Sequence, residues 1–90
     1  MGKVLGKAHP DYGITLSSIG SIYLKIGKYE KALKNYHECL ILQDAAFGRI
    51  HRNYASTLGS IGLTYYKMGK YEKALSNYEN CLILQEKIFG

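Results

Sequence analysis

Hydrophobic residues recur along the first half of the chain in two stripes with helical spacing, and a glycine separates the stripes. The first stripe consists of Leu16, Ile19, Tyr23 and Ile26. The second consists of Tyr29, Ala32, Leu33, Tyr36, Cys39 and Leu40. Members three or four residues apart share one face of a helix. Gly27, between the stripes, can adopt the left-handed conformation that ends a helix without steric cost. The pattern therefore predicts a hairpin of two helices, roughly residues 10–26 and 29–46.

The same pattern returns 42 residues later. Residues 7–48 and 49–90 align without a gap and are identical at 25 of 42 positions, including the whole stretch GKYEKAL that begins at Gly27 and again at Gly69. A repeat of this length indicates one supersecondary unit that is stacked on its copy. The chain is thus predicted to hold two copies of one unit.

The second copy predicts helices at roughly 52–68 and 71–88. We expect an all-α fold, in which antiparallel helix-turn-helix repeats stack as a short right-handed α-solenoid of about four helices. Residues 1–6 resemble the end of a unit, so we interpret them as the tail remnant of a preceding repeat. Repeat 1 then spans residues 7–48 and repeat 2 spans residues 49–90.

Gly20 and Gly62 lie inside the first predicted helix of each unit at the same position of the repeat. Glycine costs about 1 kcal/mol against alanine in a helix interior. We therefore expect the neighbouring helix to approach closely at both glycines.

The spacing of large apolar, glycine, aromatic and small residues resembles the tetratricopeptide repeat, a helix-turn-helix unit. The first copy matches with Leu16, Ile19, Gly20, Tyr23, Gly27, Tyr29, Ala32, Tyr36 and Cys39. The second copy matches with Leu58, Ile61, Gly62, Tyr65, Gly69, Tyr71, Ala74, Tyr78 and Cys81. The 42-residue length resembles the longer variant of the kinesin light chain and nephrocystin type. The start GKAHPDYG fits that variant, whereas the copy GRIHRNYA has Arg52 in place of its proline.

The resemblance implies a protein-protein interaction module that binds a peptide or protein in a concave groove lined by the first helix of each unit. Carried over by register, the groove comprises Ile14, Ser17, Ser18, Ser21, Leu24, Lys25, Ser56, Gly59, Ser60, Leu63, Tyr66 and Lys67. Ser18 and Ser60 stand where asparagines often hold the ligand backbone. Leu24, Leu63 and Tyr66 are the best apolar anchors. A face that is merely solvated is an equally good interpretation of these positions.

The resemblance also suggests a second function, because a repeat buries its apolar face only against a neighbour. We expect the chain to be a fragment of a longer array, with no helix covering its last apolar residues. Homo-oligomers could form through these uncapped ends by stacking or by exchange of helices. The residues expected to mediate this self-association are Leu82, Ile83, Ile88 and Phe89.

Composition limits the classes of partner that the chain is expected to bind. Twelve basic and seven acidic residues give a net charge of +5, which favours an acidic protein or peptide. The basic residues are scattered, so we expect no nucleic-acid binding. The longest apolar runs, such as CLIL, have four residues, against about 20 for a membrane-spanning helix, so we expect no membrane contact.

The sequence contains few candidates for catalytic, cofactor-binding or metal-binding residues. The sequence shows neither a phosphate-binding glycine loop nor a nucleophile with a base at helical spacing, so we predict that the protein is not an enzyme and uses no cofactor or metal. His9 and His51 are expected to cap or pack at the helix starts. Cys39 and Cys81 occupy small-residue positions on the buried stripe, and two reduced thiols suggest a cytoplasmic protein.

Overall fold

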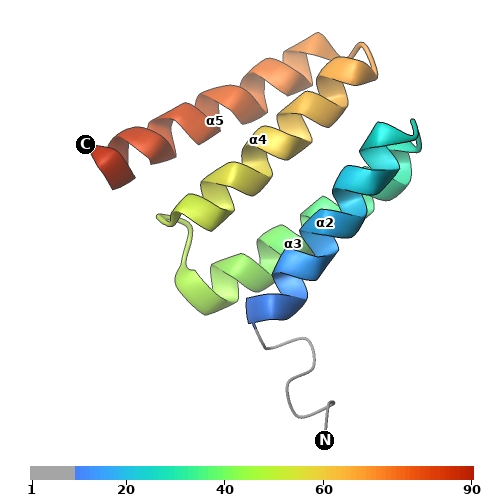
Figure 1. The fold of residues 1–90 in the computed structure, drawn as a ribbon. Coiled ribbons are helices and arrows are strands. Elements are labelled where there is room, and N and C mark those ends of the chain that lie inside the picture. Colours follow the sequence, from blue (N-terminus) through green and yellow to red (C-terminus); the bar gives the residue numbers. More distant parts are fainter. Residues whose placement is uncertain (1–9) are drawn as a thin grey trace, which may run out of the picture.

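Four α-helices account for nearly all of the chain that the computed structural model describes, which is residues 10–90 (Figure 1). The helices are α2 (Pro10–Lys25), α3 (Tyr29–Phe47), α4 (Arg52–Lys67) and α5 (Tyr71–Phe89). Their bounds agree with the predicted ones to within one residue, and no strand occurs between residues 10 and 90. The predicted tail remnant at residues 1–6 and the predicted role of His9 lie outside the described residues.

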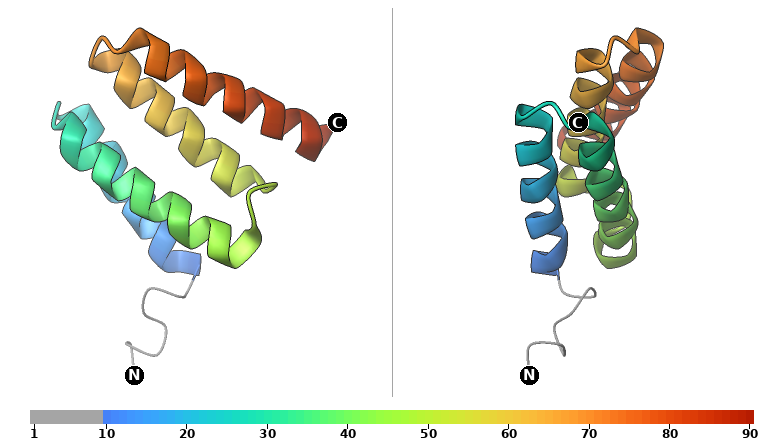
Figure 2. Two further views of the ribbon diagram at one scale, coloured as in Figure 1. Left: turned by 180° about the vertical axis from the view of Figure 1, so that it is seen from behind. Right: turned by 90° about the vertical axis from the view of Figure 1, so that its right-hand side faces the viewer.

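The helices form two antiparallel hairpins that stack side by side. Helices α2 and α3 make the first hairpin and α4 and α5 make the second, while α3 packs along α4 and joins the two units. Helix α5 lies beyond α4, away from α2 and α3 (Figure 2). This arrangement confirms the predicted all-α stack of helix-turn-helix repeats.

The turn inside each hairpin has the same backbone geometry. Gly27 and Gly69 have φ of 85° and 81°, the left-handed region that glycine adopts readily. The next residue bonds back to the helix, because the Lys28 N–H donates to the Tyr23 carbonyl at 2.8 Å. In the second unit the Lys70 N–H donates to the carbonyl of Tyr65 at 2.9 Å. These bonds close the carboxyl end of α2 and α4 in a Schellman motif, as the repeated GKYEKAL stretch predicts.

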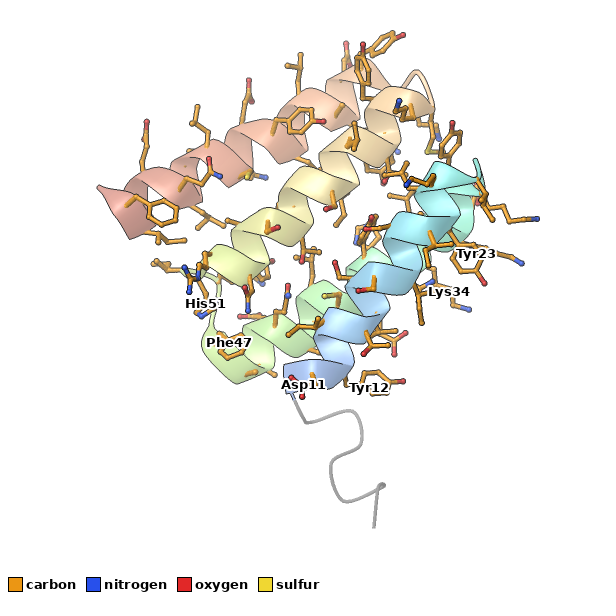
Figure 3. The ribbon with its side chains drawn as sticks, viewed as in Figure 1. Asp11, Tyr12, Tyr23, Lys34, Phe47 and His51 are labelled. Carbon is orange, nitrogen blue, oxygen red and sulfur yellow. The ribbon has the colours of Figure 1, made fainter. Side chains whose placement is uncertain are left out.

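The connection between the units is fixed by a histidine cap. His51 precedes α4, and its Nδ1 accepts a hydrogen bond of 3.1 Å from the backbone N–H of Asn53. The ring of His51 also stacks on Phe47 with centroids 4.3 Å apart (Figure 3). The predicted capping and packing role of His51 is therefore confirmed.

Two clusters of buried apolar residues lie at or beside the junction of the units. One contains Ala32, Tyr36 and Ile61, so it includes residues of both units. The other contains Ala55, Leu58 and Cys81 and lies within the second unit, and Leu40 of α3 packs against both clusters.

Gly20 and Gly62 each lie under a tyrosine of the neighbouring helix. A Cβ at Gly20 would lie 2.9 Å from Cε1 of Tyr36, and a Cβ at Gly62 would lie equally close to Cε1 of Tyr78. Real Cβ atoms essentially never have so short a contact. The predicted close approach of the two helices is confirmed in both units.

Part of the predicted apolar stripe of α2 is open to solvent. Ile19 is 39% exposed and Ile26 is 58% exposed, whereas Ile61, the copy of Ile19, is fully buried. The difference arises because α3 covers this side of α4, while no element among residues 10–90 covers the same side of α2.

Candidate functional site

The twelve predicted groove residues lie on α2 and α4, the two first helices, which contact each other directly. None of the twelve is fully buried. Ser17, Leu24, Gly59 and Ser60 are half-buried, and the other eight side chains are exposed. We call this set the groove face. Eight of its twelve residues are thus open to solvent.

The apolar part of the groove face is divided between the two units. Ile14 of α2 is 53% exposed, and Leu63 and Tyr66 of α4 are 38% and 54% exposed. The ring centroids of Tyr66 and Tyr71 lie 5.6 Å apart, so the Tyr66 ring packs beside the turn between α4 and α5. Leu24 instead packs partly against the first core cluster, so it is a weaker anchor than the sequence suggests.

Two of the five serine hydroxyls of the groove face bond to carbonyls of their own helices. Ser18 donates to the Ile14 carbonyl at 3.1 Å, and Ser60 donates to the Ser56 carbonyl at 3.3 Å. In these positions both hydroxyls keep free lone pairs but no free hydrogen. They can therefore accept a hydrogen bond from a ligand N–H, which is half of what an asparagine would offer.

Ser21 differs from the other groove serines because it bonds to a core residue. Its hydroxyl lies 2.9 Å from the hydroxyl of Tyr36. Tyr36 is 1% exposed and would otherwise have its phenol oxygen buried without this partner. In the second unit Leu63 replaces Ser21, so the corresponding Tyr78 lacks the equivalent serine.

The four residues predicted for self-association have different environments. Leu82, Ile83 and Phe89 are 57%, 50% and 68% exposed. Ile88, in contrast, is half-buried, because it packs against the second core cluster in its own unit. The structure thus separates three accessible side chains of α5 from one that stabilises the hairpin.

A buried polar network at the junction of the units was not predicted from the sequence. The Thr57 Oγ1 atom lies 2.8 Å from Oε1 of Gln43 and 3.0 Å from the Asn53 carbonyl, and it can donate to one of them at a time. Thr57 and Gln43 are 2% and 6% exposed. The available signal was that both residues recur in the other copy, as Thr15 and Gln85, next to apolar positions.

Both cysteines are free and bridge the helices of their own unit. The Cys39 thiol donates to the Gly13 carbonyl, and the Cys81 thiol donates to the Ala55 carbonyl, each at 3.1 Å. Burial raises the pKa of the Cys39 thiol above its ordinary value, and the hydrogen bond with Thr57 lowers it by less. Burial likewise raises the pKa of Cys81. The thiols are therefore held in the protonated, unreactive form, which suits a packing role.

The described residues offer no site for metal chemistry. Between residues 10 and 90 no group of three or more histidine, cysteine, aspartate or glutamate side chains is placed to hold a metal ion. None of the four described helices is long and apolar enough to cross a membrane.

Two stacked helical hairpins with an accessible face on their first helices define a helical-repeat scaffold. The family model of the tetratricopeptide repeat matches residues 11–87. The chain therefore belongs to the tetratricopeptide repeat family, whose members generally act as non-catalytic modules of protein-protein interaction. No curated protein matches the chain.

Proposed function

We propose that the groove face binds a peptide or a segment of a partner protein. The observation that carries this proposal is the exposed apolar set Ile14, Leu63 and Tyr66 on two helices that lie in contact. Burial of apolar side chains of a partner against such anchors provides most of the binding free energy in a peptide groove.

The polar groups of the groove face favour an acidic ligand. Lys25 and Lys67 are exposed at the carboxyl ends of α2 and α4, and the chain has a net charge of +5. Ser18 and Ser60 supply hydrogen-bond acceptors for ligand N–H groups. The ligand that fits best has one or two apolar side chains, an accessible backbone N–H and a nearby carboxylate.

Selection from a displayed library of random 12-residue peptides would test the groove. We expect the selected peptides to combine apolar and acidic residues and to bind the Leu63→Ala, Tyr66→Ala double variant at least about tenfold more weakly, as measured by fluorescence anisotropy. Ile41→Ala is the matched control, because Ile41 is 70% exposed on α3 and lies outside the groove face. Equal weakening by the control, or no effect of the double variant, would refute groove binding.

Finer assignments rest on the sequence. We propose that the units are the 42-residue variant of the kinesin light chain and nephrocystin type, which the exact 42-residue spacing supports. We also assign the protein to the cytoplasm, because two free cysteines suit a reducing compartment.

A second candidate function is self-assembly through exposed faces of α2 and α5. The observation that favours it is the exposure of large apolar side chains on α5, among them Leu82 and Phe89, and on α2, among them Ile22. Sedimentation velocity between micromolar and millimolar concentration tests it. A sedimentation coefficient that does not change with concentration would rule out self-assembly.

A further inference from the structure

The contact between α3 and α4 shows how one unit of this chain recognises the next. Helix α3 contributes Leu33, Tyr36, Leu40 and Gln43. On the α4 side, Thr57, Ile61 and Thr64 are at most 2% exposed. Leu33, Tyr36 and Leu40 pack in the cluster around Ile61, and Gln43 bonds to Thr57. The junction thus combines apolar packing with one buried polar pair.

Helix α5 carries the same four residues at the equivalent positions, and no element among residues 10–90 covers them. Leu75, Tyr78, Leu82 and Gln85 are the copies of Leu33, Tyr36, Leu40 and Gln43. We call these four residues the α5 face. Leu75 is 58% exposed and Tyr78 is 38% exposed, although the copy of Tyr78 in α3 is 1% exposed. Within the described part of the chain, the α5 face is therefore an exposed copy of the surface that binds α4.

Helix α2 presents the other half of the junction. Thr15, Ile19, Ile22 and Ile26 are the copies of Thr57, Ile61, Thr64 and Met68. We call these four residues the α2 face. Thr15 is exposed, and Ile22 is 62% exposed where its copy in α4 is completely buried. The exchange of Thr64 for Ile22 makes this face more apolar than the one that α4 buries.

We propose that the α5 face of one copy of this chain binds the α2 face of a second copy, in the register that α3 uses on α4. The proposal rests on the second candidate function and adds which surfaces meet. The occupant is a second copy because the bound form of this junction already exists within the molecule, with all four residues of the α5 face unchanged.

The buried polar pair selects this orientation over a symmetric one. In the proposed contact Gln85 meets Thr15, as Gln43 meets Thr57 inside the chain. If two α5 faces met instead, no threonine would face Gln85, so the Gln–Thr pair that joins the units inside the chain could not form. Two different surfaces form a heterologous contact, which propagates as an open row or a ring and does not close as a two-fold dimer.

The turn between the helices gives a second point of contact. Inside the chain Lys67 and Met68 of the second unit line the same hollow as residues 27–31 of the first unit. The equivalent hollow of the second unit is lined only by residues 70–73 among those described. In the proposed contact Lys25 and Ile26 of the next copy would complete it.

A complementation experiment with two charged variants tests the surfaces. Leu82→Glu blocks the α5 face and Ile22→Glu blocks the α2 face, and both side chains are more than half exposed, so the fold should persist. Circular dichroism checks that each variant keeps its helical fold, and Leu75→Glu replaces Leu82→Glu if the latter does not fold. By sedimentation velocity we expect wild type to form a concentration-dependent series and each variant alone to be monomeric. An equimolar mixture should give a 1:1 dimer and nothing larger. The α5 face of Ile22→Glu can bind the α2 face of Leu82→Glu, and the two remaining faces are blocked.

The alternatives give different patterns. If two α5 faces met, Ile22→Glu would self-associate like wild type, and if two α2 faces met, Leu82→Glu would do so. Either result would overturn the head-to-tail contact and leave self-assembly standing. A monomeric wild type would overturn both the head-to-tail contact and self-assembly, and it would leave the proposal of groove binding unaffected. Ile41→Glu is the matched control and should assemble like wild type, because Ile41 is 70% exposed on α3 outside both faces.

A variant of the polar pair tests the register. Thr15→Val should weaken association roughly tenfold, because Gln85 would then be buried without its partner. Unchanged or tighter association would show that Gln85 and Thr15 do not meet, and would overturn the proposed register.

Discussion

The glycines beneath Tyr36 and Tyr78 allow the same substitution to be made in two equivalent sites with opposite freedom to relax. Gly20→Ala and Gly62→Ala each place a Cβ 2.9 Å from a tyrosine ring carbon. Tyr36 is 1% exposed and bonds to Ser21, so it has no room to move. Tyr78 is 38% exposed and can turn toward solvent. We expect Gly20→Ala to destabilise the protein and Gly62→Ala to be harmless or stabilising.

The magnitudes follow from two opposing contributions. Alanine improves helix propensity by about 1 kcal/mol in both variants. Overpacking a core that cannot relax costs about 1 to 3 kcal/mol, and this cost applies in full only at Gly20. The free energy of unfolding should therefore fall by about 0 to 2 kcal/mol in Gly20→Ala and rise by up to about 1 kcal/mol in Gly62→Ala.

Urea unfolding followed by far-ultraviolet circular dichroism measures both variants against wild type. It is run at the lowest usable concentration, so that association does not cover Tyr78. In a domain of this size about 1 kcal/mol also moves the melting temperature by roughly 4 to 8 °C. Equal destabilisation by the two substitutions, or a larger loss in Gly62→Ala, would refute the argument from the mobility of the tyrosine.

Three further predictions concern stability. Thr57→Val should cost about 1 to 3 kcal/mol in urea unfolding, because it leaves Gln43 without its buried partner, whereas the matched Thr15→Val should change the monomer by at most about 0.5 kcal/mol. Gly27→Ala should lower the free energy of unfolding by about 1 to 2 kcal/mol through backbone strain at its φ of 85°, since an added Cβ meets nothing within 4 Å. Gly27→Asn should lose less, because asparagine tolerates a positive φ better, and an equal loss in the two variants would contradict this reasoning. Burial raises the pKa of Cys39, so the thiol of the unfolded chain loses its proton at a lower pH than the thiol of the folded chain. The free energy of unfolding should therefore fall between about pH 8 and pH 10. In Cys39→Ala it should fall less steeply with pH, and an identical pH dependence in the two proteins would contradict this.

The helices and turns were predictable because their signals are local and occur twice. The spacing of Leu16 and Tyr23 defines a helix face, and Gly27 marks its end whatever the neighbouring unit does. The close approach at Gly20 followed from the cost of a glycine inside a helix. The exposure of eight of the twelve groove-face residues followed from the repeat register.

Burial was harder to predict than secondary structure, because it depends on which neighbour is present. Ile19 and Ile61 are identical in type and position, yet one is 39% exposed and the other is buried. The pairing of Thr57 with Gln43 joins residues 14 positions apart on different helices. The inward turn of the Ser18 hydroxyl depends on a χ angle, which residue identity does not determine.

The junction between α3 and α4 has a consequence for how such a chain can lengthen. A duplicated 42-residue segment inserted between residues 48 and 49 would meet, at each of its ends, a surface that already matches it. Growth by tandem duplication would therefore need no new core, and each added unit would gain a Gln–Thr pair and a tyrosine buried over a glycine. Divergence would then be free to act on the groove face, where Ser21 and Leu63 already differ between the two copies.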